Sequence, residues 1–443
     1  MKTNVPVSSQ TPTTHEGGTA ARQTPLLELT RAVSTCLLWE NTFYEKGSDI
    51  ALRIADLCDL VPLPEIAKLA IKAREDLHLR HVPLWLVLQM ARVQHGQKDK
   101  SPIVAETVEA VCQRADEMGE LLALYWREGK KPIPAQIKRG LAKAFPRFTA
   151  YQLAKWNRDS TVKLRDVLFL VRPKSKDEAQ RETWKQLVDG TLAAPDTWEV
   201  ALSSGADKKA TWERLLTEKK LGYMALLMNL RNMTEAAVTP ALVEAALREG
   251  AKDSQALPFR FLMASKHAPQ YAAALSDAMV AAVTGSLEGE TAIVIDVSGS
   301  MDDKISGKST LSRWEAAAAL AVLLRELTPT CRVFTFSTGL VEVQNWRGLP
   351  LVNGVDTSQE HGATYLERSL ATLKAALPSP YRLVVVTDEQ AHDGILPCWA
   401  PYGYIINVGP YKPGLATTNG WHRISGWSER VIDWMREAEA DRA

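Results

Sequence analysis

The sequence predicts two fold types in one chain: an irregular helical-repeat domain, followed by a doubly wound parallel sheet with helices on both faces. Two periodicities indicate this. From Leu26 to about Val283, apolar residues return every three to four positions in segments of about 10–20 residues, and almost nothing resembles a strand. From Glu288 onward, short apolar and β-branched runs alternate with helical patterns, which is typical of a parallel sheet covered on both faces.

Pro, Gly or Asp interrupts the helical pattern of the first part. Successive helices without strands favour a solenoid or ring of helical repeats. Because no clean period is present, we expect irregular, HEAT-like repeats. The clearest helices are expected at residues 49–60, 84–93, 104–125, 134–145, 208–221 and 239–248.

The apolar runs of the second part predict strands at residues 291–297, 332–336, 383–387 and 404–408. Helical patterns between and after them lie at residues 313–327, 365–377 and 428–439. Ligand sites in such sheets lie at the carboxyl ends of the strands.

The change of periodicity divides the chain into domains. We expect an N-terminal arm at residues 1–24, the helical-repeat domain at 25–285 and the sheet domain at 286–443.

The composition, 46% hydrophobic and 24% charged, is that of an ordinary soluble globular protein. No stretch is long and apolar enough to cross a bilayer, and the polar start lacks the apolar core of a signal peptide. We expect a flexible arm there and a cytoplasmic protein. Five scattered cysteines without metal-ligand spacing suit a reducing compartment, and each is expected to be a small buried residue. They are Cys36, Cys58, Cys112, Cys331 and Cys398.

The net charge of +1 hides a strong asymmetry. Between Lys130 and Lys176 the chain has 13 basic residues, opposed only by Asp159 and Asp166, so this segment carries +11 and the rest −10. A field this uneven indicates an anionic partner.

A cluster of oxygen donors follows the first predicted strand. Asp296, Ser298 and Ser300 alternate on a loop where the strand ends, and their side chains are expected to converge. Thr364 precedes a predicted helix, and Asp388 ends another predicted strand. Carboxylate and hydroxyl oxygens suit Mg²⁺ or another divalent cation. The alternative is that Asp and Ser after a strand only cap the next helix.

The order of these five donors resembles the metal-ion-dependent adhesion site of von Willebrand factor A domains, which is Asp-x-Ser-x-Ser, then Thr, then Asp. The resemblance implies a metal at the top of the sheet, with one coordination position open for a partner's carboxylate. His361 and His392 are the only nearby candidates for a general base, and we expect both to be loop-surface residues. The protein is therefore not expected to be an enzyme.

The basic stretch begins with an amphipathic helix. Ile137, Leu141 and Phe145 share its apolar face, and basic residues lie on the other. Cations interleaved with aromatics follow, as at Lys155 and Trp156. Such residues neutralise phosphates and stack on unpaired bases, which favours nucleic acid. The alternative is a solvated helical face, and most of the aromatics are expected in the core.

The chain resembles the TROVE module of the Ro ribonucleoprotein family. The similarity lies in segments in the family's order: 14–18, 137–174, 197–199, 212–213, 224–233 and 257–260, followed by the metal-site domain. It implies a monomeric ring of helical repeats closed by the von Willebrand domain. The family binds misfolded small RNAs and Y RNAs, and its bacterial members work with exoribonucleases in RNA processing.

By this resemblance, seven residues are expected to contact RNA phosphates: Lys138, Arg139, Lys143, Lys155, Arg158, Arg165 and Arg172. The chain departs from the family at Leu164, where many relatives have His, at Trp156, where they often have Tyr, and at Met228, where Arg is common. These departures affect the expectation of specific Y-RNA recognition and not that of a general RNA-binding surface.

Three hypotheses follow. The first is an RNA-binding scaffold in RNA quality control or processing. The second is an adhesion-type module whose metal grips a partner's carboxylate and whose helices are only a scaffold. The third, a metal nuclease, needs a second metal or a general base, and the sequence offers neither clearly.

Overall fold

The computed structural model describes residues 13–18, 24–35, 46–194, 198–203, 205, 207–254, 256, 258–283, 285–305, 310–411, 414–415, 420–426 and 430–440. The chain divides into two compact units. We call them the helical unit (Pro25–Trp39 and Gly47–Leu221) and the sheet unit (Met1–Thr24, Glu40–Lys46 and Gly222–Ala443).

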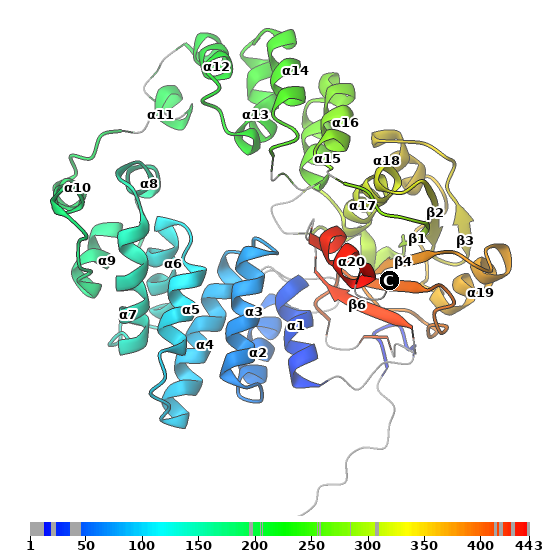
Figure 1. The fold of residues 1–443 in the computed structure, drawn as a ribbon, viewed down its shortest axis with the longest axis horizontal. Helices are drawn as coiled ribbons and strands as arrows, with labels where there is room; N and C mark the ends of the chain where they lie inside the picture. Colours follow the sequence, from blue (N-terminus) through cyan, green and yellow to red (C-terminus); the bar gives the residue numbers. More distant parts are fainter. Residues whose placement is uncertain are drawn as a thin grey trace, which may run out of the picture. The chain divides into compact units, whose positions relative to one another are not determined.

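The described residues of the helical unit form helices and no strands, as predicted. α3 packs on α4 and α5, and α5 packs on α7, so the helices stack largely in chain order (Figure 1). The α-helices are α1 (Pro25–Thr35), α2 (Gly47–Cys58), α3 (Leu63–Glu75), α4 (His81–Gln97), α5 (Ile103–Val111), α6 (Ala115–Tyr125), α7 (Ala135–Ala144), α8 (Ala150–Trp156), α9 (Leu164–Val171), α10 (Glu178–Asp189), α11 (Trp198–Ser203) and α12 (Lys208–Thr217).

One predicted helix, at residues 104–125, is wrong: the chain breaks there into α5 and α6. The buried Glu117 carboxylate accepts hydrogen bonds from the backbone N–H groups of Gln113 and Arg114, at 2.9 Å each. Arg74 donates to the same carboxylate at 2.9 Å. Glu117 therefore caps the start of α6 and fixes the break, a role that the apolar periodicity does not reveal.

The sheet unit begins with helices. They are α13 (Tyr223–Glu235), α14 (Pro240–Glu249), α15 (Pro258–His267) and α16 (Ala272–Ala281). The change to strands falls at Glu290, close to the predicted position, and these four helices belong to the same compact unit as the sheet. The compact unit that contains the sheet therefore includes the chain from Gly222 onward, and the strands within it begin at Glu290.

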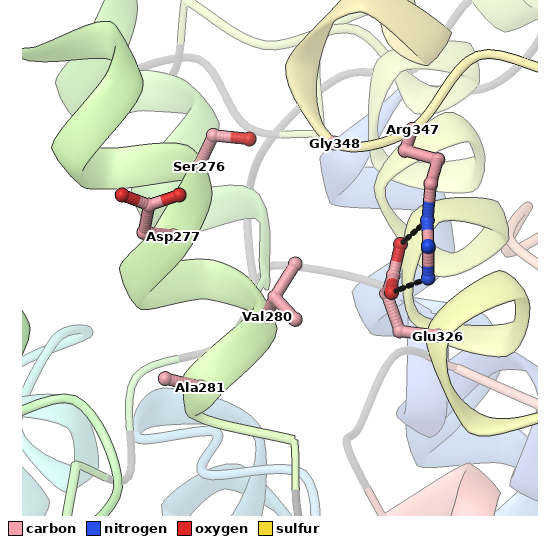
Figure 2. A pocket seen from close by; sticks show the side chains of 7 residues that line it. All are labelled: Ser276, Asp277, Val280, Ala281, Glu326, Arg347 and Gly348. Carbon is pink, nitrogen blue, oxygen red and sulfur yellow. Dashed lines mark hydrogen bonds and ion pairs between the residues drawn. The ribbon is translucent and has the colours of Figure 1, made fainter.

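A hollow lies between α16, the helix Arg313–Leu327 and the loop before Leu349 (Figure 2). Seven residues line it: Ser276, Asp277, Val280, Ala281, Glu326, Arg347 and Gly348. The backbone N–H of Leu349 donates to Ser276 Oγ at 3.4 Å, and Arg347 forms a two-armed ion pair with Glu326. Gly348 has φ +60°, and a Cβ there would lie 2.1 Å from Ser276 Oγ. Only glycine allows so close an approach between α16 and this loop.

The sheet has six strands in the order β3-β2-β1-β4-β5-β6, parallel except for β3. The strand order extends outward in both directions from β1 and β4, as in a doubly wound sheet. The strands are β1 (Glu290–Asp296), β2 (Thr330–Phe336), β3 (Leu340–Glu342), β4 (Arg382–Thr387), β5 (Tyr402–Asn407) and β6 (Trp421–Ser425). Sequence patterns missed β3 and β6, which lie at the two edges, where strands are short and less buried.

Helices cover both faces of the sheet, which explains its continuously apolar strands. They are α17 (Arg313–Leu327), α18 (Leu349–Asp356), α19 (Leu366–Ala376) and α20 (Arg430–Ala440). Leu366 and Leu370 of α19 pack with Ala292 and Val294 of β1. On the other face, Glu439 of α20 pairs with Arg382 of β4. The sequence predicted α17, α19 and α20 but not α18.

The described cysteines are free thiols, and Cys58, Cys112 and Cys331 are buried, as predicted. Burial raises the pKa of Cys58 and that of Cys331 to about 12. These thiols are therefore packing residues and not nucleophiles. Cys398 is half-buried, and Cys36 lies outside the described residues. No helix in the described part of the chain is long and apolar enough to cross a membrane.

Candidate metal site and basic surface

Three loops meet at the carboxyl end of the sheet. The first follows β1, the second precedes α19, and the third follows β4. The N–H of Gly299 in the first loop donates to the carbonyl of Gly362 in the second at 3.2 Å. The N–H of His392 in the third donates to the carbonyl of Thr364 in the second at 2.8 Å. The backbone therefore holds the five predicted donor positions on three adjoining loops.

Asp296 is fully buried at the end of β1. Ser298 N donates to its Oδ1 at 2.9 Å, and Thr387 Oγ1 donates to its Oδ2 at 2.6 Å. Burial, and then the negative charge of Asp388, raise the pKa of Asp296 to about 7. The two carboxylates thus repel each other in a region with little water.

The hydroxyl donors are buried as well. Ser298 Oγ and Ser300 Oγ lie 3.4 Å apart, so both serines direct their hydroxyls to one place. Thr364 is buried, and its N–H donates to His392 Nδ1 at 3.2 Å. The alternative interpretation is that these residues only cap a helix. The short 3₁₀ turn at Gly299–Asp302 has no side-chain cap from Ser298.

This donor set fits a hard divalent cation. It offers two carboxylates and three hydroxyls, all buried, on backbone that hydrogen bonds hold in place. In the described part of the chain, no group of three or more His, Cys, Asp or Glu side chains is placed to hold a metal. A cation here would therefore depend on the serine and threonine hydroxyls.

Arg313 is a site residue that sequence patterns missed. Its guanidinium lies 3.7 Å from Asp388 Oδ2 and donates to the Tyr411 hydroxyl at 2.7 Å. It also donates to the Ser300 carbonyl at 3.3 Å, so it joins the first and third loops. Arg313 starts α17, and the only sequence signal was a basic residue at a helix start, where the helix dipole disfavours it.

His361 and His392 lie on loops, as expected, but each side chain also contacts other residues of the site. His361 Nδ1 lies 2.7 Å from Asp302 Oδ1, and its ring meets Trp314 edge-on. His392 contacts Thr364 through Nδ1 and Glu16 through Nε2, at 3.0 Å. Each ring is half-buried and holds a loop of the site in place, so neither is presented as a free general base.

A short N-terminal segment also lies on the third loop. Thr14 Oγ1 donates to the Ala391 carbonyl at 2.6 Å, and His15 N donates to Gln390 Oε1 at 2.9 Å. Gly18 N donates to Ala391 O at 3.1 Å, and a Cβ at Gly18 would lie 2.2 Å from that oxygen. Residues 13–18 are therefore held on the sheet unit, whereas we expected a flexible arm over 1–24. The rest of that arm, apart from Thr24, lies outside the described residues.

The second predicted site, the basic surface, lies on α7, α8, α9 and the loops between them. Ile137, Leu141 and Phe145 are fully buried, as predicted. The seven predicted contact residues lie at the surface, six exposed and Lys155 half-buried. In the described part of the chain only Lys143 among them makes an ion pair, with Glu109 at 3.7 Å. Elsewhere, surface cations are commonly paired within their helix, as Arg214 is with Glu218.

Aromatic side chains lie among these cations. Three cations surround the half-buried Trp156 ring: Arg114 at 3.5 Å from the ring centre, Arg158 at 4.9 Å and Lys155 at 5.6 Å. Tyr151 is exposed beside Lys155. Phe145 and Phe148 are buried. The expectation that most aromatics belong to the core therefore holds for the two phenylalanines and fails for Tyr151.

Several charged residues of the basic surface line a small hollow beside α9. Its lining includes the cations Arg158, Lys163 and Arg165 and the acids Asp159 and Asp189. Lys163 pairs with Asp159 at 2.9 Å. Arg147, by contrast, donates to the carbonyls of Glu109 and Cys112 at the end of α5, so this cation has a structural role.

Comparisons with known proteins agree with the predicted resemblance. A family model described as the TROVE domain matches residues 190–283, which run from the end of α10 to the end of α16. The match includes neither the basic stretch nor the sheet. Two relatives, named telomerase protein component 1, are 36% identical in mouse and 35% in rat over 78 residues, or 16% of this chain. The chain spans only 3% of each relative's length.

A solved structure has the same fold over nearly the whole chain. It is the Ro (Rsr) protein of Deinococcus radiodurans, with a TM-score of 0.58 and 17% identity. The match covers 93% of this chain and 98% of the Deinococcus chain. The predicted resemblance to the TROVE and Ro proteins is thereby confirmed, as is the fold class of helical repeats followed by a doubly wound sheet.

Proposed function

We propose that this chain, a relative of TROVE-domain proteins with the fold of a Ro protein, binds RNA through the basic surface of its helical unit. The observation that carries the proposal is the set of exposed cations without ion pairs in the described residues: Lys138, Arg139, Arg158, Arg165 and Arg172. Unpaired cations concentrated on neighbouring elements attract a polyanion, and phosphates of RNA are the polyanion that the resemblance implies.

The finer expectations rest on that resemblance. They are a small structured or misfolded RNA of the Y-RNA type, a role in RNA quality control or processing with an exoribonuclease, and a monomeric ring. The cytoplasmic location that we propose rests instead on the sparse, scattered cysteines, which suit a reducing compartment. The contacts around His361 and His392 favour structural roles for both rings, so the proposal assigns no catalytic residue.

The test is RNA binding by the full chain as a function of salt. If several phosphates are contacted, log affinity falls steeply and linearly with log salt. Reversing three charges together, Arg139→Glu, Lys143→Glu and Arg158→Glu, should remove most of the binding. The matched control reverses three exposed cations outside the basic stretch, Lys72, Lys98 and Lys100, and should change affinity far less. Absence of binding to structured or single-stranded RNA at low salt would refute the proposal.

We also infer that the loops after β1 and β4 and before α19 hold a divalent cation such as Mg²⁺, for recognition of a partner's carboxylate. The ligands would be Asp296, Ser298, Ser300, Thr364 and Asp388. The observation that favours this second function is the burial of two mutually repelling carboxylates, with the pKa of Asp296 raised to about 7. The bound cation would supply positive charge and an open coordination position.

The test is thermal unfolding with and without MgCl₂. A ligand that binds only the folded state stabilises it, by about 2.7 kcal/mol at one hundred times its Kd. We expect the wild type to gain stability with Mg²⁺ and Asp296→Asn to gain none. The asparagine keeps the size of the side chain and can still bond Ser298 and Thr387, so it should fold. Equal gains for both proteins would refute the site.

A further inference from the structure

The most exposed aromatic side chain in the described part of the chain lies on α9, within the basic surface. Phe169 is 61% exposed, whereas Leu164, Val167 and Val171 of the same short helix are buried. A single exposed hydrophobic residue is ordinary on a protein surface. Phe169 differs from the ordinary case because of the two residues beside it.

Arg165 and Arg172 lie four positions before and three positions after Phe169. At these spacings the three side chains share one face of the helix or its end. Both arginines are exposed, and in the described residues neither guanidinium makes an ion pair or a hydrogen bond. An apolar ring thus lies between two free cations, and the span from Arg165 to Arg172 is about 10 Å along the helix axis.

Arg172 is an unusual residue for its position. It follows the last turn of α9 with φ +50°, a left-handed conformation in which helices usually place glycine or asparagine. Its N–H still donates to the Leu168 carbonyl at 3.0 Å, so the backbone requires only the conformation and not the side chain. The backbone therefore leaves the cationic side chain available for another role.

Arg165, at the other end, also lines the hollow that contains Arg158, Lys163, Asp159 and Asp189. Since Lys163 is paired with Asp159, Arg165 and Arg158 are the cations there that make no ion pair in the described residues. Phosphates would thus be attracted to both ends of the helix, with Phe169 between them.

We propose that Phe169 is a stacking platform for one unpaired base of a bound RNA, while Arg165 and Arg172 hold the phosphates on either side. This inference rests on the proposed RNA binding and specifies which part of the RNA is bound. Within a strand, a base can stack on an exposed ring only when it is unpaired, because a duplex covers the faces of all its bases except those at its two ends. The platform therefore selects single-stranded segments by stacking, and any base can occupy it.

The experiment measures the affinity of the full chain for two probes, a single-stranded oligouridylate and a blunt RNA duplex with the same number of phosphates. Loss of one stacked base corresponds to a roughly 5- to 150-fold loss of affinity. We expect Phe169→Ala to weaken oligouridylate binding in this range and to leave duplex binding and the salt dependence unchanged. Phe169→Trp should bind the single strand at least as well as the wild type, whereas Phe169→Leu should not restore it.

Two controls separate stacking from other effects. Leu60→Ala removes another large exposed side chain from the helical unit and should leave both affinities unchanged. Arg172→Gly should flatten the plot of log affinity against log salt by about one phosphate contact. Lys98→Gly is its match, because Lys98 follows α4 in the same left-handed conformation, with φ +55°, and it should leave the slope unchanged.

The outcomes distinguish this inference from the proposal beneath it. If the wild type binds neither probe, the stacking inference and the proposed RNA binding both fail. If the wild type binds and Phe169→Ala binds the single strand equally well, the platform is wrong and RNA binding stands. If Phe169→Leu binds as tightly as the wild type, the contact is simple apolar burial, such as a protein partner would also make, and stacking is refuted.

Discussion

The two candidate sites of this chain are built in opposite ways. At the top of the sheet, every predicted donor is buried, and hydrogen bonds between the three loops hold the donors in place. On α7, α8 and α9, the predicted contact residues lie at the surface, and most make no ion pair in the described residues. A buried site must satisfy each polar group locally, whereas a solvated surface leaves its cations free to meet a partner's charges.

The difference explains how each site responds to mutation. Removing one partner from a buried, hydrogen-bonded charge leaves the other charge without compensation, so stability falls. Removing one exposed cation leaves the fold almost unchanged and affects only binding. The three predictions below test this contrast, from the largest effect on stability to the smallest.

The largest loss of stability is expected from a substitution of Arg382, the first residue of β4. Its guanidinium is fully buried, pairs with Glu439 through both arms and donates to Thr291 Oγ1 at 2.7 Å. Arg382→Ala should lower the free energy of unfolding by about 3–5 kcal/mol, measured by urea denaturation. The control is Arg332→Ala, which removes a similar two-armed pair with Glu342 at the exposed edge, and should cost at most about 1 kcal/mol. Equal losses would mean that burial does not set the cost.

An intermediate effect is expected at Gly18, where the N-terminal segment meets the third loop. A Cβ would lie 2.1 Å from the Asp393 carbonyl, so Gly18→Ala must displace one backbone from the other. We expect a loss of about 1–3 kcal/mol and faster hydrogen exchange at the Gly18 amide. Gly96→Ala is the control with the opposite sign, because that helical position is open and alanine should add about 0.5–1 kcal/mol. Unchanged exchange at Gly18 would show that the segment is not held there.

The smallest effect on stability is expected at Arg139, an exposed residue of α7 without an ion pair in the described residues. Arg139→Ala should change the unfolding free energy by less than about 0.5 kcal/mol. It should still flatten the plot of log RNA affinity against log salt by about one contact. A large loss of stability, or an unchanged slope, would show that Arg139 belongs to the fold and not to the binding surface.

The sequence alone determined the fold type of each region and located the five residues of the candidate metal site. Both follow from local rules: strand and helix periods set the elements, and donors at the ends of parallel strands must converge at one edge of the sheet. The sequence also located the basic segment that forms the basic surface. It did not show which cations of that segment make ion pairs, because charge composition does not reveal contacts.

Only the tertiary structure decided the rest, because the deciding contacts join residues far apart in the chain. Arg313 reaches Tyr411 and Asp388 across the sheet, and Thr14 reaches Ala391 from the other end of the chain. His392 is drawn into the site by Thr364 and Glu16. Nothing in the local pattern of these residues signals their partners, and the exposure of Phe169 likewise appears only once α9 has buried its other face.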